Sequence, residues 1–231
     1  MKVSYRDLNL INLFTLRTTN RMFTSHGHKA NHKFKFDEDI LVNKDGKAFI
    51  TDSWSVGDAP NGGYMMCIAI NAARKHIHLR DPLVMTGYYF NKSVENCELD
   101  IDTKVLNSTK NTSTVQVQLS QEGQLKSQYI GTFGSHSSLK GPTHYTITAP
   151  NLDNRGDCYN ASKIVRKHYG DNLKIAQRFE MRVPKNDHFA TSTMVSKKGN
   201  IASLQSWVAF SDGRNVIVVN YFLSIIICSQ H

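Results

Sequence analysis

The sequence predicts an α+β fold in which an antiparallel sheet curls around a single buried helix. The run from Tyr64 to Ala73 is apolar except for Asn71, so a helix there has almost no polar face and must be buried. Segments that alternate apolar and polar residues follow it, separated by short turns, as antiparallel strands do. The order strand, strand, helix and strand meander also argues against a doubly wound fold.

The predicted elements follow one another along residues 34–134. Residues 34–42 and 48–56 alternate and flank a turn at 43–46, which predicts a hairpin. The helix is expected over 61–77, and it ends before Pro82 because the residue preceding a proline is pushed out of helical geometry. Four strands are expected after it, over 83–91, 98–109, 112–121 and 124–134. The predicted core includes Tyr64, Ile68, Val117, Leu119 and Ile130.

The predicted helix begins at a glycine pair, in the sequence Asn61-Gly62-Gly63-Tyr64. Glycine has no Cβ to shield the backbone N–H groups, and a helix start also carries the positive end of the helix dipole. A carbonyl or phosphate oxygen can bind there without a charged side chain. These four residues are therefore a candidate carbonyl clamp. A tight entry turn, in which glycine only lets helix and sheet approach closely, explains them equally well.

The composition of the chain limits the kinds of ligand and partner that we expect it to bind. The chain has 231 residues and a formal net charge of +9, which favours anionic ligands. Its Lys and Arg residues are scattered rather than gathered on one face, so we expect no nucleic-acid partner. The four cysteines, Cys67, Cys97, Cys158 and Cys228, show no metal-type spacing. We therefore expect no metal, reduced thiols and an intracellular, cytoplasmic location.

The two ends of the chain suggest three further expectations. Residues 8–36 contain basic but no acidic residues, which is compatible with a mitochondrial presequence or with a disordered tail. The apolar run at 216–228 is too short for a transmembrane segment. Exposure of its side chains would promote association, so we expect a homo-oligomer.

A second region echoes the first. Ser-Trp pairs at 53–54 and 206–207 are each followed by an Asp and an Asn at nearly the same spacing, and then by an apolar run. Such an echo indicates two copies of one domain. The expected organisation is a basic, disordered tail at 1–33, a first domain at 34–138, a linker at 139–160 and an incomplete second copy at 161–231.

The segments PNGGYMMCIAINAARKH and DPLVMTGYYF, together with the strand STVQVQLSQ, resemble the N-terminal half of the thioesterase-like superfamily. This superfamily is related to type II acyl-CoA thioesterases, which are built as a double hotdog. The resemblance implies a hotdog fold with an incomplete second copy, an acyl-CoA ligand and no cofactor. It implies hydrolysis of fatty acyl-CoA to fatty acid and CoA, with the clamp holding the thioester carbonyl.

Catalytic groups are harder to assign. In the family, an acidic residue, a Ser or Thr and a Gln activate water on strands of the second hotdog. We expect these strands to be absent from the incomplete second copy. Thr86, Ser113 and Gln128 could orient a ligand or water, or could be ordinary polar strand residues, and without a base they cannot transfer the proton. Arg74 and Lys75 are candidates for binding CoA phosphates.

Two alternatives stay open beside the hydrolase. The chain could be a non-catalytic acyl-CoA or lipid-binding relic, or a subunit that a partner completes. A hotdog hydratase would need an Asp/His pair near the helix. The only nearby pair, Asp58 with His76, is expected at opposite helix ends, which disfavours that reading.

Overall fold

The structure is a computed structural model of the chain, and it describes residues 34–142, 153–185 and 206–213. The predicted N-terminal tail at 1–33 and the apolar run at 216–228 lie outside these residues. Within the described residues, no helix is long and apolar enough to cross a membrane.

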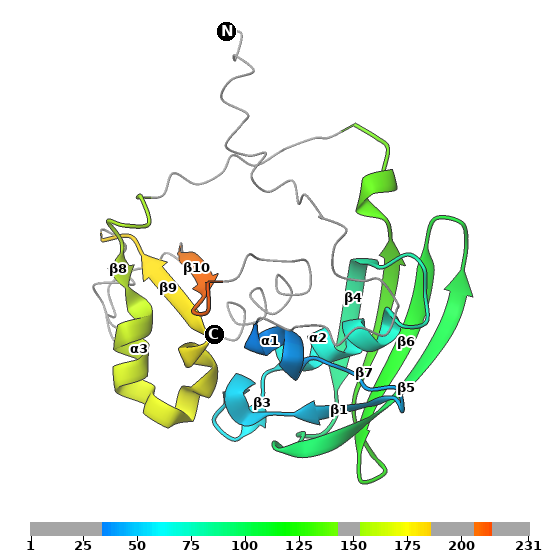
Figure 1. Cartoon of the computed structure of the whole chain (residues 1–231), viewed down its shortest axis with the longest axis horizontal. Helices are drawn as coiled ribbons and strands as arrows, with labels where there is room; N and C mark the ends of the chain where they lie inside the picture. Colours follow the sequence, from blue (N-terminus) through cyan, green and yellow to red (C-terminus); the bar gives the residue numbers. More distant parts are fainter. Residues whose placement is uncertain (1–33, 143–152, 186–205, 214–231) are drawn as a thin grey trace, which may run out of the picture. The chain divides into compact units, whose positions relative to one another are not determined.

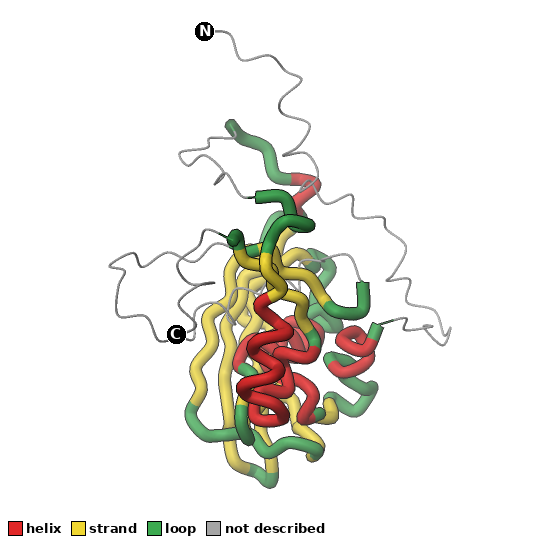
Figure 2. The backbone as a smooth tube through the Cα atoms, turned by 90° about the vertical axis from the view of Figure 1, so that its left-hand side faces the viewer, coloured by secondary structure: helices red, strands yellow, loops and turns green. Residues whose placement is uncertain are grey.

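A five-stranded antiparallel sheet curls around one helix, as the sequence predicts (Figures 1 and 2). The helix, α2 (Gly62–Ala73), lies against one face, and ten of its twelve residues are buried, so it has no solvent face. In spatial order the strands are β1 (Lys47–Ile50), β5 (Cys97–Ser108), β6 (Ser113–Gln121), β7 (Gln124–Gly134) and β4 (Asp81–Tyr89).

The strands bury the face that contacts α2. Strict alternation along β6 places Val115, Val117 and Leu119 on this inner face, where all three are buried. With Tyr64 and Ile68 of α2 they form part of one hydrophobic core. Four of the five predicted core residues are therefore confirmed.

Ile130 is the exception, with 37% of its surface exposed. It follows Tyr129 on β7, and neighbouring residues of a strand point to opposite faces. Tyr129 takes the inner face, which leaves Ile130 on the outer face, where it pairs with Thr86 and Gln116. The prediction that Ile130 belongs to the core was wrong.

The first predicted strand, over 34–42, is also wrong. Residues Lys35–Asp39 form a short helix, α1, and no strand precedes β1 among the described residues. Asp37 and Glu38 suit the first turn of a helix, where the dipole favours negative charge. Phe36 and Ile40 are four residues apart, so both can be buried on one side of a helix. That spacing was mistaken for alternation.

Between β1 and α2 the chain makes a compact entry. A 3₁₀ turn, η3 (Asp52–Trp54), leads into the two-residue strands β2 (Ser55–Val56) and β3 (Ala59–Pro60), which pair with each other. The helix then ends at Ala73 rather than at residue 77. Arg74 caps it, and Lys75 and His76 continue in turns whose N–H groups donate to Ala72 and Ala73.

The second described region contains its own small sheet. Strands β8 (Tyr159–Asn160), β9 (Phe179–Val183) and β10 (Trp207–Phe210) are antiparallel in the order β10-β9-β8. Helix α3 (Ala161–Tyr169) and the 3₁₀ segment η5 (Gly170–Gln177) connect β8 to β9. A further turn, η4 (His136–Ser138), ends the first region, and β8 begins within the predicted linker 139–160.

Candidate functional site

The N-terminus of α2 is capped by the side chain of Asn61. Its Oδ1 accepts hydrogen bonds from the N–H of Gly63 at 2.8 Å and of Tyr64 at 3.4 Å. Asn61 has extended backbone geometry and is itself buried, as suits a residue that enters a helix inside the protein. Two of the donors that a carbonyl clamp would use are therefore already engaged.

Tyr64 has a packing role in this structure. Its side chain is fully buried, and its hydroxyl donates to the carbonyl of Asp39 at 2.9 Å. Burial raises the pKa of Tyr64 far above its ordinary value. The hydroxyl ties α1 to α2 and points away from solvent, so it offers a ligand no direct contact.

Gly62 is covered by a residue that the sequence did not single out. The hydroxyl of Tyr89, at the end of β4, donates to the Gly62 carbonyl at 2.7 Å. A Cβ placed on Gly62 would lie 3.0 Å from that hydroxyl oxygen. The absence of a side chain on Gly62 is thus what lets Tyr89 rest on the helix start.

The three polar strand candidates do not converge. Thr86 and Gln128 lie on the outer face of the sheet, where Gln128 accepts a hydrogen bond from Gln118 at 2.8 Å. Ser113 is buried on the inner face and lies 3.0 Å from the hydroxyl of Ser108. Along β6, Ser113 lies five residues, or about 17 Å, from Gln118, the residue that pairs with Gln128. The structure does not assemble them into one constellation.

The candidate phosphate-binding residues lie at the other end of α2, about 18 Å from Gly62 for a helix of this length. Arg74 donates through Nε to the carbonyl of Arg80 at 2.9 Å. The ammonium of Lys75 donates to the carbonyls of Val42 and Asn43, and burial lowers its pKa. Lys75 also lines a pocket of about 500 Å³. Both cations hold the chain around α2, and Lys75 keeps access to this pocket.

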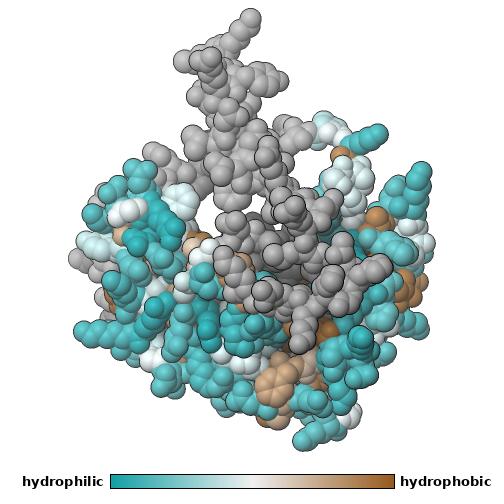
Figure 3. Space-filling view, viewed as in Figure 1, coloured by the Kyte–Doolittle hydropathy of each residue, from teal (hydrophilic) through white to brown (hydrophobic). Residues whose placement is uncertain are grey.

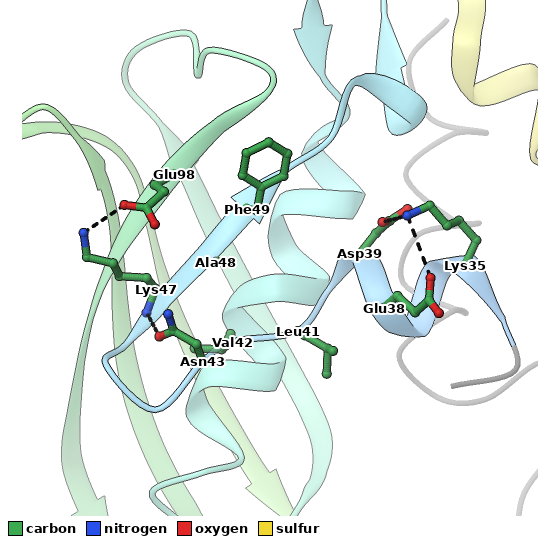
Figure 4. A pocket seen from close by; sticks show the side chains of 10 residues that line it. All are labelled: Lys35, Glu38, Asp39, Leu41, Val42, Asn43, Lys47, Ala48, Phe49 and Glu98. Carbon is green, nitrogen blue, oxygen red and sulfur yellow. Dashed lines mark hydrogen bonds and ion pairs between the residues drawn. The ribbon is translucent and has the colours of Figure 1, made fainter. Parts of the chain in front are cut away.

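A second pocket, of about 460 Å³, opens between α1 and β1 (Figure 4). Its charged side chains already pair with one another: Lys35 with Asp39 at 2.6 Å, and Lys47 with Glu98 at 3.0 Å. The exposed ring of Phe49 is its main apolar element. The pocket therefore shows neither an unpaired charge for a phosphate nor a deep apolar channel.

The inner face of the sheet carries no carboxylate among the described residues. The positions turned toward α2 on the five strands are apolar, small or hydroxyl-bearing, apart from the amide of Gln121 at the end of β6, and α2 itself has no acidic residue. The nearest acid on the chain before α2, Asp58, is exposed and paired with Lys92. The buried carboxyl of Asp39 lies near Tyr64, but it already accepts from Trp54 and pairs with Lys35, so general-base chemistry at the start of α2 would need a further acid.

A comparison with known proteins finds a match over the segment that contains α2 and the strands around it. Residues 50–134 match the family model of the acyl-CoA thioesterase N-terminal domain. No curated protein matches the chain. The matched segment runs from the end of β1 to the end of β7, so it contains α2 with its glycine start and the four long strands.

Solved structures extend the likeness. A conserved hotdog-fold protein of unknown function from Alicyclobacillus acidocaldarius has a TM-score of 0.70 at 15% identity, covering 84% of this chain and 69% of that one. The acyl-CoA thioesterase II TesB2 from Mycobacterium marinum has a TM-score of 0.58 at 12% identity, covering 83% and 67%. The tesB protein of Mycobacterium avium subs. paratuberculosis has a TM-score of 0.58 at 13% identity, covering 83% and 67%.

These findings define the class of the protein. The fold is a hotdog, with a sheet wrapped around α2. The matches to solved structures cover more of the chain than residues 34–142 contain, which fits a double-hotdog arrangement. Residues 50–134 match the acyl-CoA thioesterase N-terminal domain, which supports the predicted thioesterase-like resemblance.

Proposed function

We propose that the protein binds fatty acyl-CoA and acts as an acyl-CoA thioesterase, releasing free fatty acid and CoA. The observation that carries this proposal is the start of α2. There the glycine pair, the Asn61 cap and Tyr89 meet within the segment that matches the thioesterase domain. The net charge of +9 favours a ligand with several phosphates. In this proposal the thioester lies at the start of α2.

A non-catalytic acyl-CoA-binding role is the second candidate, and a specific observation favours it. Because the described inner face lacks a carboxylate, this region has no evident group to take a proton from water. Loss of general-base assistance typically costs about a hundred- to ten-thousand-fold in rate. In that case the chain would bind acyl-CoA without turnover, or would rely on an acid from a partner.

The two candidates separate in one experiment. The purified chain is incubated with acyl-CoA of several chain lengths, and bound acyl-CoA and free CoA are followed by mass spectrometry. Catalytic release of CoA supports the enzyme, whereas stoichiometric retention of intact acyl-CoA supports the binding protein. Absence of both binding and release would refute the proposed function.

A glycine variant locates the site in the same assay. In Gly62→Val the new side chain would meet Tyr89 and crowd the helix start, so acyl-CoA binding should be lost. Gly156→Val is the matched control, because a Cβ on Gly156 meets nothing within 4 Å. Equal binding by both folded variants would place the ligand elsewhere.

We further propose that the chain forms a homo-oligomer through β4. Among the described strands β4 pairs only with β7, so one edge of a nine-residue strand has no described partner. Val84 and Tyr88 on its outer face, and Phe90 just beyond it, are each about half exposed. Long apolar edge strands favour pairing with another chain. Light scattering should show a dimer or larger species, and Val84→Lys should shift it toward monomer.

Residue assignments and location complete the proposal. Asn61, Gly62, Gly63 and Tyr64 shape the site. Ser113 lies on the inner face but away from the start of α2, and Thr86 and Gln128 lie on the outer face, so we assign none of these three a role in it. Lys75 and Arg74 are proposed to help hold CoA phosphates. Cys67, Cys97 and Cys158 form no disulfide with one another, which fits a reducing intracellular compartment.

A further inference from the structure

Tyr129 lies across the edge strand because residue 87 is a glycine. Tyr129 on β7 pairs with Gly87 on β4, and a Cβ on Gly87 would lie 2.7 Å from Cε1 of the tyrosine ring. The terminal methyl group of Met66, on α2, lies 3.4 Å from the same position. The ring is therefore held between β4 and the first half of α2, with no surface exposed to solvent.

Two neighbouring hydroxyls on β7 are buried without a hydrogen bond. These are the hydroxyl of Tyr129 and that of Ser127, two residues away on the same inner face. The Ser127 and Tyr89 side chains lie close enough to the Tyr129 hydroxyl to influence its pKa through weak hydrogen bonds. The geometry of these contacts does not meet the criteria of a full hydrogen bond, which leaves both inner hydroxyls poorly satisfied among the described residues. Buried polar groups are nearly always satisfied, so two adjacent exceptions mark a place where a ligand or water could bind.

Tyr89 stands between this hydroxyl pair and the start of α2. It pairs with Ser127 across the ladder, and its ring meets that of Tyr129 edge-on with centroids 5.7 Å apart. Its hydroxyl reaches the Gly62 carbonyl, so all three side chains gather at the N-terminus of α2. Tyr89 is nevertheless 51% exposed. Tyr89 is thus held by its bond to Gly62 and by its contact with Tyr129, while half of its surface faces solvent.

We propose that the hydroxyls of Ser127 and Tyr129 bind the carbonyl oxygen of the acyl thioester, and that Tyr89 closes over it. This inference rests on the proposed function. The two hydroxyls take the place of the helix N–H groups as the main donors to the carbonyl, because the N–H groups of Gly63 and Tyr64 already donate to Asn61. A carbonyl oxygen accepts two hydrogen bonds, which matches two hydroxyl donors. In this proposal Tyr89 turns outward to admit the ligand.

The protonation state of Tyr129 fits this role. Burial, and next the neighbouring Tyr89, raise the pKa of Tyr129 well above its ordinary value. The phenol therefore stays protonated at neutral pH and can donate a hydrogen bond. It is unsuited to act as a base, so its contribution is to position and polarise the carbonyl.

The test compares Tyr129→Phe and Ser127→Ala with Tyr88→Phe, a control on the outer face of β4. Because neither inner hydroxyl makes a well-aligned hydrogen bond with the described residues, its removal should leave the urea midpoint unchanged or raise it. Affinity for acyl-CoA should fall about tenfold in each, the worth of one hydrogen bond, while affinity for free CoA stays the same. Tyr88→Phe should change neither quantity.

Three outcomes would overturn the inference or its basis. A marked fall in the urea midpoint of Tyr129→Phe would show that its hydroxyl has a structural partner. Unchanged acyl-CoA affinity in both inner variants would refute the carbonyl assignment while leaving the proposed function intact. A wild-type chain that binds no acyl-CoA would refute the proposed function, and the carbonyl assignment with it.

Discussion

Helices α2 and α3 begin in the same way but sit in opposite environments. Each has an asparagine N-cap: Asn61 accepts from Gly63 and Tyr64, and Asn160 accepts from Lys163 at 3.3 Å. Ten residues of α2 are buried, whereas Ser162 is the only buried residue of α3. Figure 3 shows the same contrast on the surface, which is largely hydrophilic over α3 and carries hydrophobic patches over the five-stranded sheet.

The difference teaches that a capped helix start is not by itself a site. At α3 the donors face solvent, and no buried, unpaired hydroxyl of the described chain lies on the strands beside it. At α2 the sheet adds Tyr89, Ser127 and Tyr129. The chemistry that we assign to the start of α2 therefore comes from the strands around it, more than from the helix dipole.

The two tryptophans should give the largest contrast between the regions. Trp54 is 1% exposed, packs on Phe36 and donates to Asp39 at 2.8 Å, whereas Trp207 is 39% exposed. Trp54→Ala should lower the free energy of unfolding by about 3–5 kcal/mol, as core aromatic truncations do, and Trp207→Ala by less than about 1.5 kcal/mol. Urea unfolding followed by circular dichroism measures both. Equal losses would contradict the unequal burial on which the comparison depends.

The two asparagine caps should differ by less. Loss of an N-cap side chain costs about 0.5–2 kcal/mol. The loss of unfolding free energy in Asn61→Ala should lie at the upper end of this range, because the substitution leaves two buried N–H groups without an acceptor. The loss in Asn160→Ala should lie at the lower end, because water can replace the hydrogen bond from Asn160 to Lys163. The comparison is made on urea midpoints, and a larger loss in Asn160→Ala would show that the solvent-facing cap matters more.

The smallest effect is expected at the ion pair that joins the two regions. Lys174 of η5 lies 2.7 Å from Asp52 of η3, and its hydrogen bond is the main cause of a lowered pKa at Asp52. A lowered folded-state pKa stabilises the protein above the ordinary carboxyl pKa of about 4, and this contribution is lost as pH falls through the folded value. The difference in urea midpoint between wild type and Asp52→Asn should therefore shrink between pH 6 and pH 3. In a Lys174→Met background the pH dependence of that difference should largely disappear.

Much of the first region could be predicted from its sequence, because burial there is periodic. Strict alternation in β6 and the apolar run of α2 each specify a face without reference to distant residues. The strand predicted over residues 34–42 was wrong because the spacing of Phe36 and Ile40 fits either an irregular strand or a helix. Only the contacts of Phe36 with Trp54 and Phe210 decide between them.

The candidate site was predicted less completely than the fold. The glycine pair marked the correct helix end, but the Asn61 side chain that occupies its donors was read as part of the clamp. Ser127 and Tyr129 were missed, although the alternation of residues 127–133 places both on the inner face. That Tyr89 and Gly62 meet depends on the register of β4 with β7, which a single sequence does not reveal.

The central claim is that the start of α2 binds the carbonyl of an acyl-CoA thioester. A hydrolysis-resistant acyl-CoA in which a methylene replaces the sulfur, labelled with ¹³C at the carbonyl, reports on that atom directly by NMR. We predict saturable binding, with the bound carbonyl signal shifted downfield from its position in water for the wild type, and a smaller shift for Tyr129→Phe. A bound signal that is the same in both proteins, or no saturable binding at all, would contradict the account.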